Sequence, residues 1–315
     1  LLLPNSKKNL RGHAGPSEEL SNSTPQLLPL VRHLHQLRTA IDFGCSQIYC
    51  DFEDPKKYRD AVKLFRETHP NSDASNPNSS IWVAPPRITK PGEDWILKLV
   101  QSSEADGYLI RNYDHLEFFK GNKRIADFSF NVSNPWTASY LLNTFGLDRL
   151  TVSYDLNFDQ VKALLNSMST DQLEITLHQH MPMFHMEHCV FCAFMSDGKD
   201  YRDCGRPCDK HEVELRDRVG QRHPLKADAG CRNTVYNGRA QTGAEYASQM
   251  IAHGVRYFRV EFINESDMEV VKTLETYQDL LSGKVDGSSV WQNLKLINQL
   301  GVTRGTLESP FEANS

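Results

Sequence analysis

Short apolar runs alternate along the chain with longer segments in which apolar residues recur at helical spacing. From Pro25 onward this strand-then-helix unit recurs with a period of roughly thirty residues, the size of a β–α repeat. The pattern predicts eight strands, which is the number that closes a barrel. They lie at 27–31, 47–52, 81–84, 107–110, 126–130, 149–153, 174–177 and 257–262.

Amphipathic helices are predicted between these strands, and two more after the last one. Strict alternation of strand and helix indicates the α/β class, and eight units favour a (β/α)8 TIM-like barrel over a doubly wound sheet. Ser266 and Glu269 form a capping-box signature for a helix that ends near residue 281. The other predicted helices are 56–67, 95–101, 135–144, 158–166, 244–253 and 289–300.

The chain divides into three predicted parts. Residues 1–25 mix small, polar and charged residues without periodicity, so we expect a flexible linker or tail. Residues 26–265 form the barrel, and residues 266–315 a C-terminal helical extension. A Cys-rich insert at 180–243, after the seventh strand, is too long for an ordinary β–α loop and is therefore expected to be functional. Because the chain starts with Leu1, we expect it to be a piece of a longer parent chain.

Composition narrows the class of protein. The 315 residues are 39% hydrophobic and 24% charged, with no apolar run of the roughly 18 residues that a membrane span requires. Lys and Arg number 35 against 40 Asp and Glu, so any nucleic-acid contact must come from a local patch. Seven cysteines cannot pair fully, and no secretion signal is visible. We therefore expect a reducing intracellular compartment, either cytoplasm or organelle stroma.

The insert carries most of the cysteines, in a spacing typical of a metal site. Cys-x2-Cys is followed by Cys-x3-Cys and then by a distant fifth cysteine, whereas tetrahedral ligation needs four. The spacing alone does not distinguish among a zinc site, a 4Fe–4S cluster and thiols that bind no metal. The candidate metal ligands are Cys189, Cys192, Cys204, Cys208 and Cys231.

Polar residues at the predicted strand ends supply the candidate chemistry. His178 and His180 share one face of the seventh strand by alternation and are expected at the barrel rim, where barrel enzymes place reactive groups. We predict that these two histidines and Asp155 act in proton transfer, the alternative being that the histidines pack beneath the insert.

Four more residues at strand ends are predicted to contact substrate. The arginines have the planar group that holds a carboxylate or phosphate, and the tyrosine could stack on an unpaired base. Surface ion pairs and core packing are the alternatives for these residue types. No serine-hydrolase elbow, Walker A loop or Rossmann glycine motif follows any predicted strand. The candidate substrate-binding residues are Arg87, Arg111, Asn112 and Tyr154.

The stretch 178–192, HQHMPMFHMEHCVFC, together with 203–208, DCGRPC, resembles the collagenase-like peptidase family U32. Further resemblance lies at 85–88, 111–112, 153–156 and 300–305, so that it extends from about residue 27 to 308. Within the family, the chain is most similar to the second barrel of the long, two-copy members.

The resemblance implies a function different from the family's name. Its better understood members include hydroxylases of the C5 position of pyrimidines in transfer RNA and 23S ribosomal RNA, and an accessory pair for ubiquinone hydroxylation. Several carry a 4Fe–4S cluster on four cysteines, and the family's pattern matches Cys192, Cys204, Cys208 and Cys231. Two departures bear on the first ligand: Cys189 lies close to Cys192, and His185 stands where some relatives have a cysteine.

On this basis we expect an iron–sulfur-dependent RNA-modifying hydroxylase, or the cluster-bearing half of one, with ribosomal RNA favoured. Its expected partners are RNA, a small organic oxygen donor or anion, and the rest of the parent chain, but no membrane. The alternatives are a metal-associated peptidase and a non-catalytic, zinc-stabilised binding barrel. Metal analysis separates iron from zinc, and digestion of a protein substrate tests for a peptidase.

Overall fold

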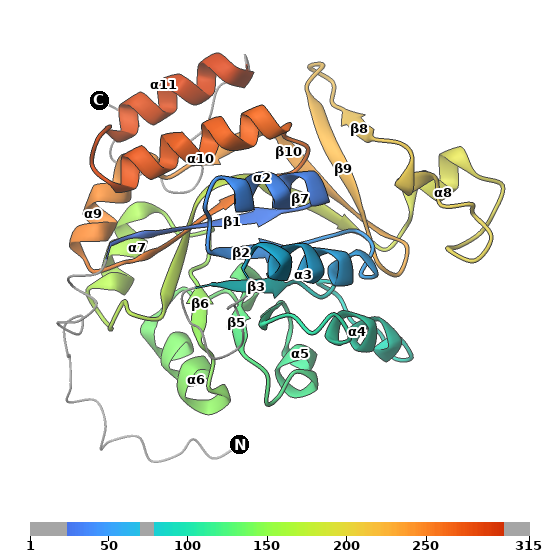
Figure 1. Cartoon of the computed structure of the whole chain (residues 1–315), viewed down its shortest axis with the longest axis horizontal. Helices are drawn as coiled ribbons and strands as arrows, with labels where there is room; N and C mark the ends of the chain where they lie inside the picture. The colour runs from blue at the N-terminus through green and yellow to red at the C-terminus, as the bar shows by residue number, and fades with distance from the viewer. Residues whose placement is uncertain (1–23, 70–78, 299–315) are drawn as a thin grey trace.

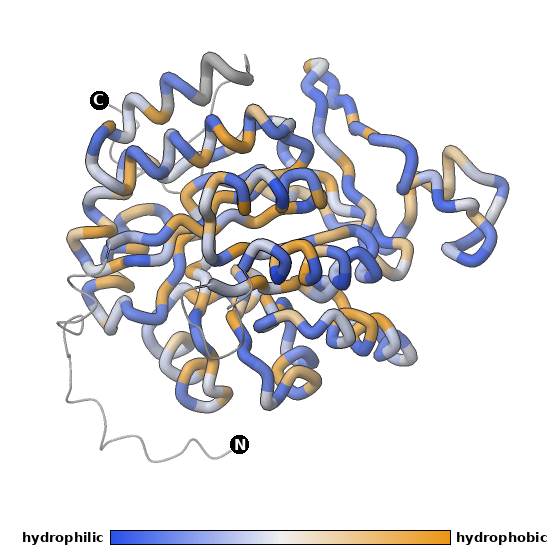
Figure 2. The backbone as a smooth tube through the Cα atoms, in the orientation of Figure 1, coloured by the Kyte–Doolittle hydropathy of each residue, from blue (hydrophilic) through white to orange (hydrophobic). Residues whose placement is uncertain are grey.

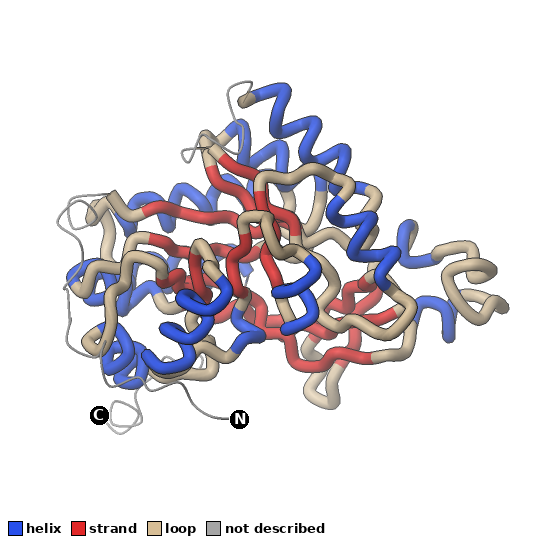
Figure 3. The backbone as a smooth tube through the Cα atoms, turned by 90° about the horizontal axis from the view of Figure 1, so that it is seen from below, coloured by secondary structure: helices blue, strands red, loops and turns tan. Residues whose placement is uncertain are grey.

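A computed structural model describes residues 24–69 and 79–298, and it confirms the predicted (β/α)8 TIM-like barrel (Figure 1). Eight parallel strands form a closed ring, because β11 pairs with both β1 and β7. Figure 3 shows the strands enclosed by helices. The ring contains β1 (Gln26–Val31), β2 (Gln47–Cys50), β3 (Ser80–Val83), β4 (Gly107–Ile110), β5 (Arg124–Ala126), β6 (Arg149–Thr151), β7 (Leu173–Met186) and β11 (Tyr257–Glu261).

The core has two layers, as expected for strands that are buried on both faces. Leu30, Trp82 and Leu109 belong to a cluster inside the ring, whereas Val31, Val83 and Ile110 pack outward against the helices. Figure 2 shows apolar residues concentrated along these strands and polar residues over the outside. Consecutive residues of one strand therefore serve different layers, which explains why the strands read as unbroken apolar runs.

Several helices begin where the sequence supplies a capping side chain. The side chains of Asn134 and Asn157 accept hydrogen bonds from the first turns of α6 and α7, and the predicted Ser266–Glu269 capping box starts α10. The helices around the barrel are α2 (Leu34–Asp42), α3 (Lys57–Thr68), α4 (Asp94–Gln101), α5 (Tyr113–Phe118), α6 (Pro135–Phe145), α7 (Phe158–Leu165), α9 (Ala247–Ala252), α10 (Asp267–Leu281) and α11 (Gly287–Asn298).

Two predicted elements are displaced. The fifth strand ends at Ala126, and the Asp127 side chain caps a 3-10 turn, η1 (Phe128–Phe130), where the prediction continued the strand. The helix predicted from residue 244 starts as a 3-10 turn, η3 (Ala244–Tyr246), before α9.

The insert is a small sheet built onto the barrel. β7 has 14 residues and continues past its predicted end, so that its second half pairs antiparallel with β10 (Arg232–Thr242). β9 (Arg222–Asp228) and β8 (Val213–Arg216) extend this sheet outward. The insert also contains α8 (Val190–Met195) and a 3-10 turn, η2 (Pro207–Asp209), and it projects beyond the barrel in Figure 1.

Several expectations concern residues outside this description. The predicted tail at 1–25 overlaps it only at its last two residues, and the motif at 300–305 lies beyond it. In residues 24–69 and 79–298, no helix has both the length and the apolar character needed to cross a bilayer.

Candidate functional site at the barrel mouth

The barrel interior is filled by an ion-pair network centred on Arg259. This side chain is fully buried; its Nη1 donates to Asp127 at 2.6 Å and its Nε to Glu174 at 2.6 Å. Thr151 Oγ1 accepts from Nη2 at 2.7 Å. The Arg259 guanidinium therefore neutralises two carboxylates buried inside the barrel.

Arg111 stands one level higher, at the mouth itself. It bonds Asp51 at 2.8 Å and Asp127 at 3.0 Å, so it joins the interior network to the rim. Burial alone would raise the pKa of Asp51, but Arg111 and Arg32 outweigh it and hold this pKa well below its ordinary value. Arg111 is therefore a positively charged side chain of the cavity wall whose position is fixed by its bonds to Asp51 and Asp127.

Arg87 has fewer hydrogen-bond partners than Arg111. Its Nε is buried and has no hydrogen-bond partner among the described residues, while its guanidinium lies 4.8 Å from the Phe128 ring centroid. Phe128 in turn lies 4.1 Å from the Tyr154 ring. Arg87 and Arg111 line one cavity of about 20 Å³, which is room for little more than a single water.

Asn112 serves the loop that carries Arg87. Its amide nitrogen donates to the Arg87 carbonyl and to Thr89 Oγ1, both at 3.0 Å, and its amide oxygen accepts from the His115 backbone N–H. Both ends of the amide are thus engaged within the protein. The geometry gives Asn112 a role in positioning the Arg87 loop, and its direct contact with substrate remains a prediction.

Tyr154 and Asp155 are adjacent in sequence but differ in burial, because Tyr154 is partly buried and Asp155 faces solvent. Burial raises the pKa of the Tyr154 phenol far above its ordinary value, so the ring is a neutral wall near Arg87. Asp155 is exposed. Its role in proton transfer remains a prediction.

His178 does not face the mouth. Between Thr176 and His178 the pairing of β7 with β11 shifts by one residue, so that His178 stands opposite Val260. It is 3% exposed, and its Nδ1 lies 3.2 Å from the hydroxyl of Tyr277 on α10. Burial lowers its pKa to about 4. The expected rim position was therefore wrong: His178 is a neutral side chain in the helical layer.

His180 lies on the same face as His178, as predicted, with ring centroids 6.4 Å apart. Its Nδ1 bonds the Asn237 carbonyl at 2.7 Å, and its Nε2 lies 3.4 Å from Glu265. Burial would lower the His180 pKa, but Glu265 raises it, and the pair brings the Glu265 pKa down to about 2. This buried ion pair ties β7 to the loop before α10.

The insert cysteines gather in one region beyond the mouth, and all are free thiols. Burial raises the pKa of Cys192, and the neighbouring Cys204, Cys189 and Cys231 raise it further. The pKa of Cys208 is raised to about 11, chiefly by burial, with Cys189 among the further causes. The predicted ligands are thus electrostatic neighbours although 42 positions separate the first from the last.

Backbone amides point at three of the five sulfurs. Cys192 N donates to Cys189 Sγ and Arg206 N to Cys204 Sγ, each at 3.4 Å, and the Tyr201 backbone N–H donates to the Cys231 thiol. Such N–H···S bonds stabilise thiolate ligands. Cys231 adopts φ 62° at the tip of the β9–β10 hairpin, and the following Arg232 anchors this tip through Glu187 at 3.0 Å.

The thiols do not form a completed site as they stand. Within the described ranges, no three His, Cys, Asp or Glu side chains converge closely enough to hold a metal ion. The donor chemistry and the N–H···S bonds fit a thiolate-bound metal, whereas the present side-chain positions require adjustment before ligation.

Several residues at the mouth were missed from the sequence. Asp228 on β9 and Tyr236 on β10 line the cavity with Arg87, and burial raises the Asp228 pKa to about 6. His185 Nε2 is buried without a partner among the described residues, while its Nδ1 bonds Thr234 Oγ1 at 2.9 Å. Alternating polar and apolar residues in 222–228 were the available signal for a strand at this position.

Residues 96–307 of the chain, more than half of its length, match peptidase family U32. The chain belongs to this family. An uncharacterized protease from Methanocaldococcus jannaschii is 20% identical over 277 residues, which cover 84% of this chain and 66% of that protein. The U32 chain described here thus spans slightly less than two thirds of this relative.

Solved structures resemble the U32 barrel only distantly. The YdjI aldolase from Escherichia coli K12 is 12% identical, with 92% of this chain and 96% of that chain covered and a TM-score of 0.41. Chitinase ChiW from Paenibacillus is 10% identical, with 79% and 42% covered and a TM-score of 0.33. At these scores neither likeness bears on activity.

Proposed function

We propose that this U32 chain is an iron–sulfur-dependent RNA-modifying hydroxylase acting at C5 of a pyrimidine, with ribosomal RNA the favoured substrate, or the cluster-bearing half of such an enzyme. One observation carries the proposal: the insert that bears the five free cysteines also covers the barrel mouth. Asp228 and Tyr236 line the mouth, and Cys231 lies between them at the tip of the same hairpin.

Two sets of four thiols are candidate ligands. The neighbours that raise the Cys192 pKa support Cys189, Cys192, Cys204 and Cys231, whereas the family's spacing supports Cys208 in place of Cys189. Three cysteines are common to both sets. A bound 4Fe–4S cluster would supply electron transfer to, or activation of, an oxygen donor.

The chain's own residues would bind and orient the substrate. Arg87, with its unpartnered Nε, would hold a phosphate or carboxylate, and Phe128 with Tyr154 would offer aromatic faces to a base. Burial raises the Asp228 pKa to about 6, so this carboxyl would exchange a proton near neutral pH, beside the roles predicted for His178, His180 and Asp155. Because the cavity holds only about 20 Å³, the β9–β10 hairpin must shift before a base enters.

The peptidase alternative has little support from the site. Among the described residues no cysteine hydrogen-bonds a histidine, and burial raises the pKa of Cys192, Cys208 and Cys231. A cysteine peptidase needs the opposite, a thiol whose pKa is depressed by a neighbouring base. A zinc-stabilised barrel remains an outcome of the metal analysis.

The first test is the metal. Anaerobic purification should give a brown protein with about four irons per chain and broad absorbance near roughly 400 nm. Cys204→Ala should lose the iron. Cys45→Ala serves as the matched control and should keep it, because Cys45 is buried in the core between the strands and the helices, away from the insert. Protein that binds zinc and no iron would overturn the cluster.

The second test is the RNA. Mass spectrometry of nucleosides from a deletion strain should show one pyrimidine lacking an oxygen that the wild type has. Re-expression of the intact gene should restore it, and the Cys204→Ala gene should not. An unchanged nucleoside profile would overturn the RNA substrate, and cleavage of casein by wild type but not by Cys204→Ala would favour the peptidase.

A further inference from the structure

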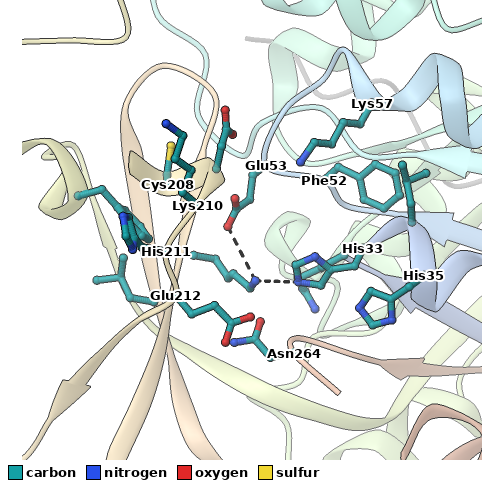
Figure 4. A pocket seen from close by; sticks show the side chains of 16 residues that line it. His33, His35, Phe52, Glu53, Lys57, Cys208, Lys210, His211, Glu212 and Asn264 are labelled. Atoms are coloured by element: carbon teal, nitrogen blue, oxygen red, sulfur yellow. Dashed lines mark hydrogen bonds and ion pairs between the residues drawn. The ribbon is translucent and has the colours of Figure 1, made fainter. Parts of the chain in front are cut away.

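A second, larger cavity of about 400 Å³ lies between the insert and the barrel (Figure 4). Its walls come from the loops after β1 and β2 on the barrel side and from η2 and β9 on the insert side. This volume falls in the range of small-molecule sites. Residues that line it include His33, Glu53, Lys57, Lys210, Lys226 and Asn264.

One amine stands in the wall of this cavity under unusual constraints. The Lys226 side chain is 9% exposed, its Nζ lies 2.9 Å from His33 Nε2, and the nearest carboxylate oxygen, Glu53 Oε1, is 3.9 Å away. Figure 4 shows His33 and Glu53 on either side of the amine, with dashed lines to it. A lysine held only to neutralise Glu53 would be expected at normal ion-pair distance, rather than bonded to an imidazole.

The surroundings favour the neutral amine. Burial lowers the pKa of Lys226, with Arg32 acting in the same direction and Glu53, Glu212 and Glu265 opposing it. Burial and Lys226 itself lower the His33 pKa to about 4, so the imidazole is uncharged at neutral pH. Burial also raises the pKa of Glu53, which makes this carboxylate a better proton acceptor for the ammonium.

Two further cations face the same space. Lys57 comes from the barrel side and Lys210 from the insert side, and both are labelled on the cavity wall in Figure 4. Among residues 24–69 and 79–298, neither makes an ion pair. A ligand with a negative group would be attracted to them.

We propose that Lys226 is a carbonyl-reactive lysine, and that this cavity binds a small aldehyde or ketone carrying an anionic group and holds it as an imine. Glu53 takes the third proton of the ammonium, and the nitrogen lone pair forms the C–N bond. The carbonyl C–O bond then breaks, and the oxygen leaves as water with the two protons of the neutral amine. The condensation needs no oxidant or reductant.

The test is trapping of the imine on the anaerobically purified holoprotein. Glyoxylate is the probe, cyanoborohydride reduces the imine, and peptide mass spectrometry measures carboxymethylation of each lysine. Lys226 should react several-fold faster at neutral pH than the exposed Lys120 and Lys284, because its lowered pKa leaves more neutral amine and the cavity cations attract the probe's carboxylate. The uncharged aldehyde propanal should show a smaller preference for Lys226.

Two variants complete the experiment. Lys226→Arg keeps the positive charge beside Glu53 and should abolish the fast adduct, while Lys162→Arg, at an exposed lysine outside the cavity, should keep it. Labelling of Lys226 at the rate of the exposed lysines, or an equal preference for propanal, would overturn the proposal. Iron content is measured on the same samples, so failure of this inference and failure of the proposed cluster are distinguishable.

Discussion

The barrel interior and the insert interface both contain many ionisable groups, but they use them differently. Inside the ring, Arg259 and Arg111 are bonded to two carboxylates each at 3.0 Å or less. At the interface, Arg87 Nε and His185 Nε2 have no partner among the described residues, and five free thiols lie in the insert. The comparison indicates that the interior charges maintain the fold, whereas the interface groups are available to ligands.

The largest expected effect comes from removing the central interior charge. Arg259→Ala leaves Asp127 and Glu174 buried without their main counter-charge, so we expect a loss of about 3–5 kcal/mol in the free energy of unfolding. Urea denaturation followed by circular dichroism measures this loss. A change below about 1 kcal/mol would contradict the structural role of the interior network.

Arg87 should behave in the opposite way. Arg87→Ala removes a cation whose Nε has no protein partner, so stability should change little, while affinity for an RNA oligonucleotide should fall roughly tenfold to a hundredfold. Fluorescence anisotropy measures the affinity, with the exposed Lys120→Ala as matched control. Equal loss in both variants would indicate nonspecific charge attraction instead of a site.

The His180–Glu265 pair belongs to the boundary between the two regions, and its contribution depends on pH. The His180 pKa is raised above its ordinary 6.5, so its contribution is complete below about pH 6.5 and is lost as the pH rises through the raised value. The Glu265 contribution is present above about pH 4.5 and is lost as the pH falls through about 2. The stability difference between wild type and His180→Gln should therefore be greatest between about pH 4.5 and 6.5, at roughly 2 kcal/mol.

Denaturation curves across this pH range measure the effect. His253→Gln serves as a control, because the His253 side chain bonds the Gln249 carbonyl one helical turn away. A constant difference from pH 5 to pH 9 would show that His180 is uncharged in the folded protein.

The smallest effect is expected at an exposed ion pair. Lys284→Gln breaks a 2.8 Å contact with Asp279 at the surface, which should change stability by about 0.5 kcal/mol or less. The same denaturation assay used for Arg259→Ala gives the comparison. A loss as large as that of the buried arginine would remove the distinction drawn between interior and exposed charge.

The barrel was predictable because its signal is periodic. Apolar runs recur with each unit, and several helices begin at a capping residue. The strand ends meet at one rim, where Arg87 and Arg111 line one cavity; their contact with substrate remains a prediction. The fifth strand was misplaced because Phe128 and Phe130 extend the apolar pattern into a 3-10 turn.

The remaining errors depend on geometry that spacing does not encode. One shift in the pairing of β7 with β11 placed His178 toward α10 instead of the mouth. The contact of Lys226 with His33 joins residues 193 positions apart, and it exists only because the insert folds back onto the barrel. Such long-range contacts leave no local pattern in the sequence.

β7 pairs with strands of the barrel and with a strand of the insert, so the position of the insert depends on the barrel wall. Its first half is held by β6 and β11, and its second half carries β10 and, through it, the hairpin with Cys231. The β9–β10 hairpin is therefore attached to the barrel through a paired strand and not through a flexible loop. The pairing is irregular around Pro182 and Tyr236, so a movement of the hairpin that carries Cys231 would bend β7 there and would displace the cysteines and the barrel wall together.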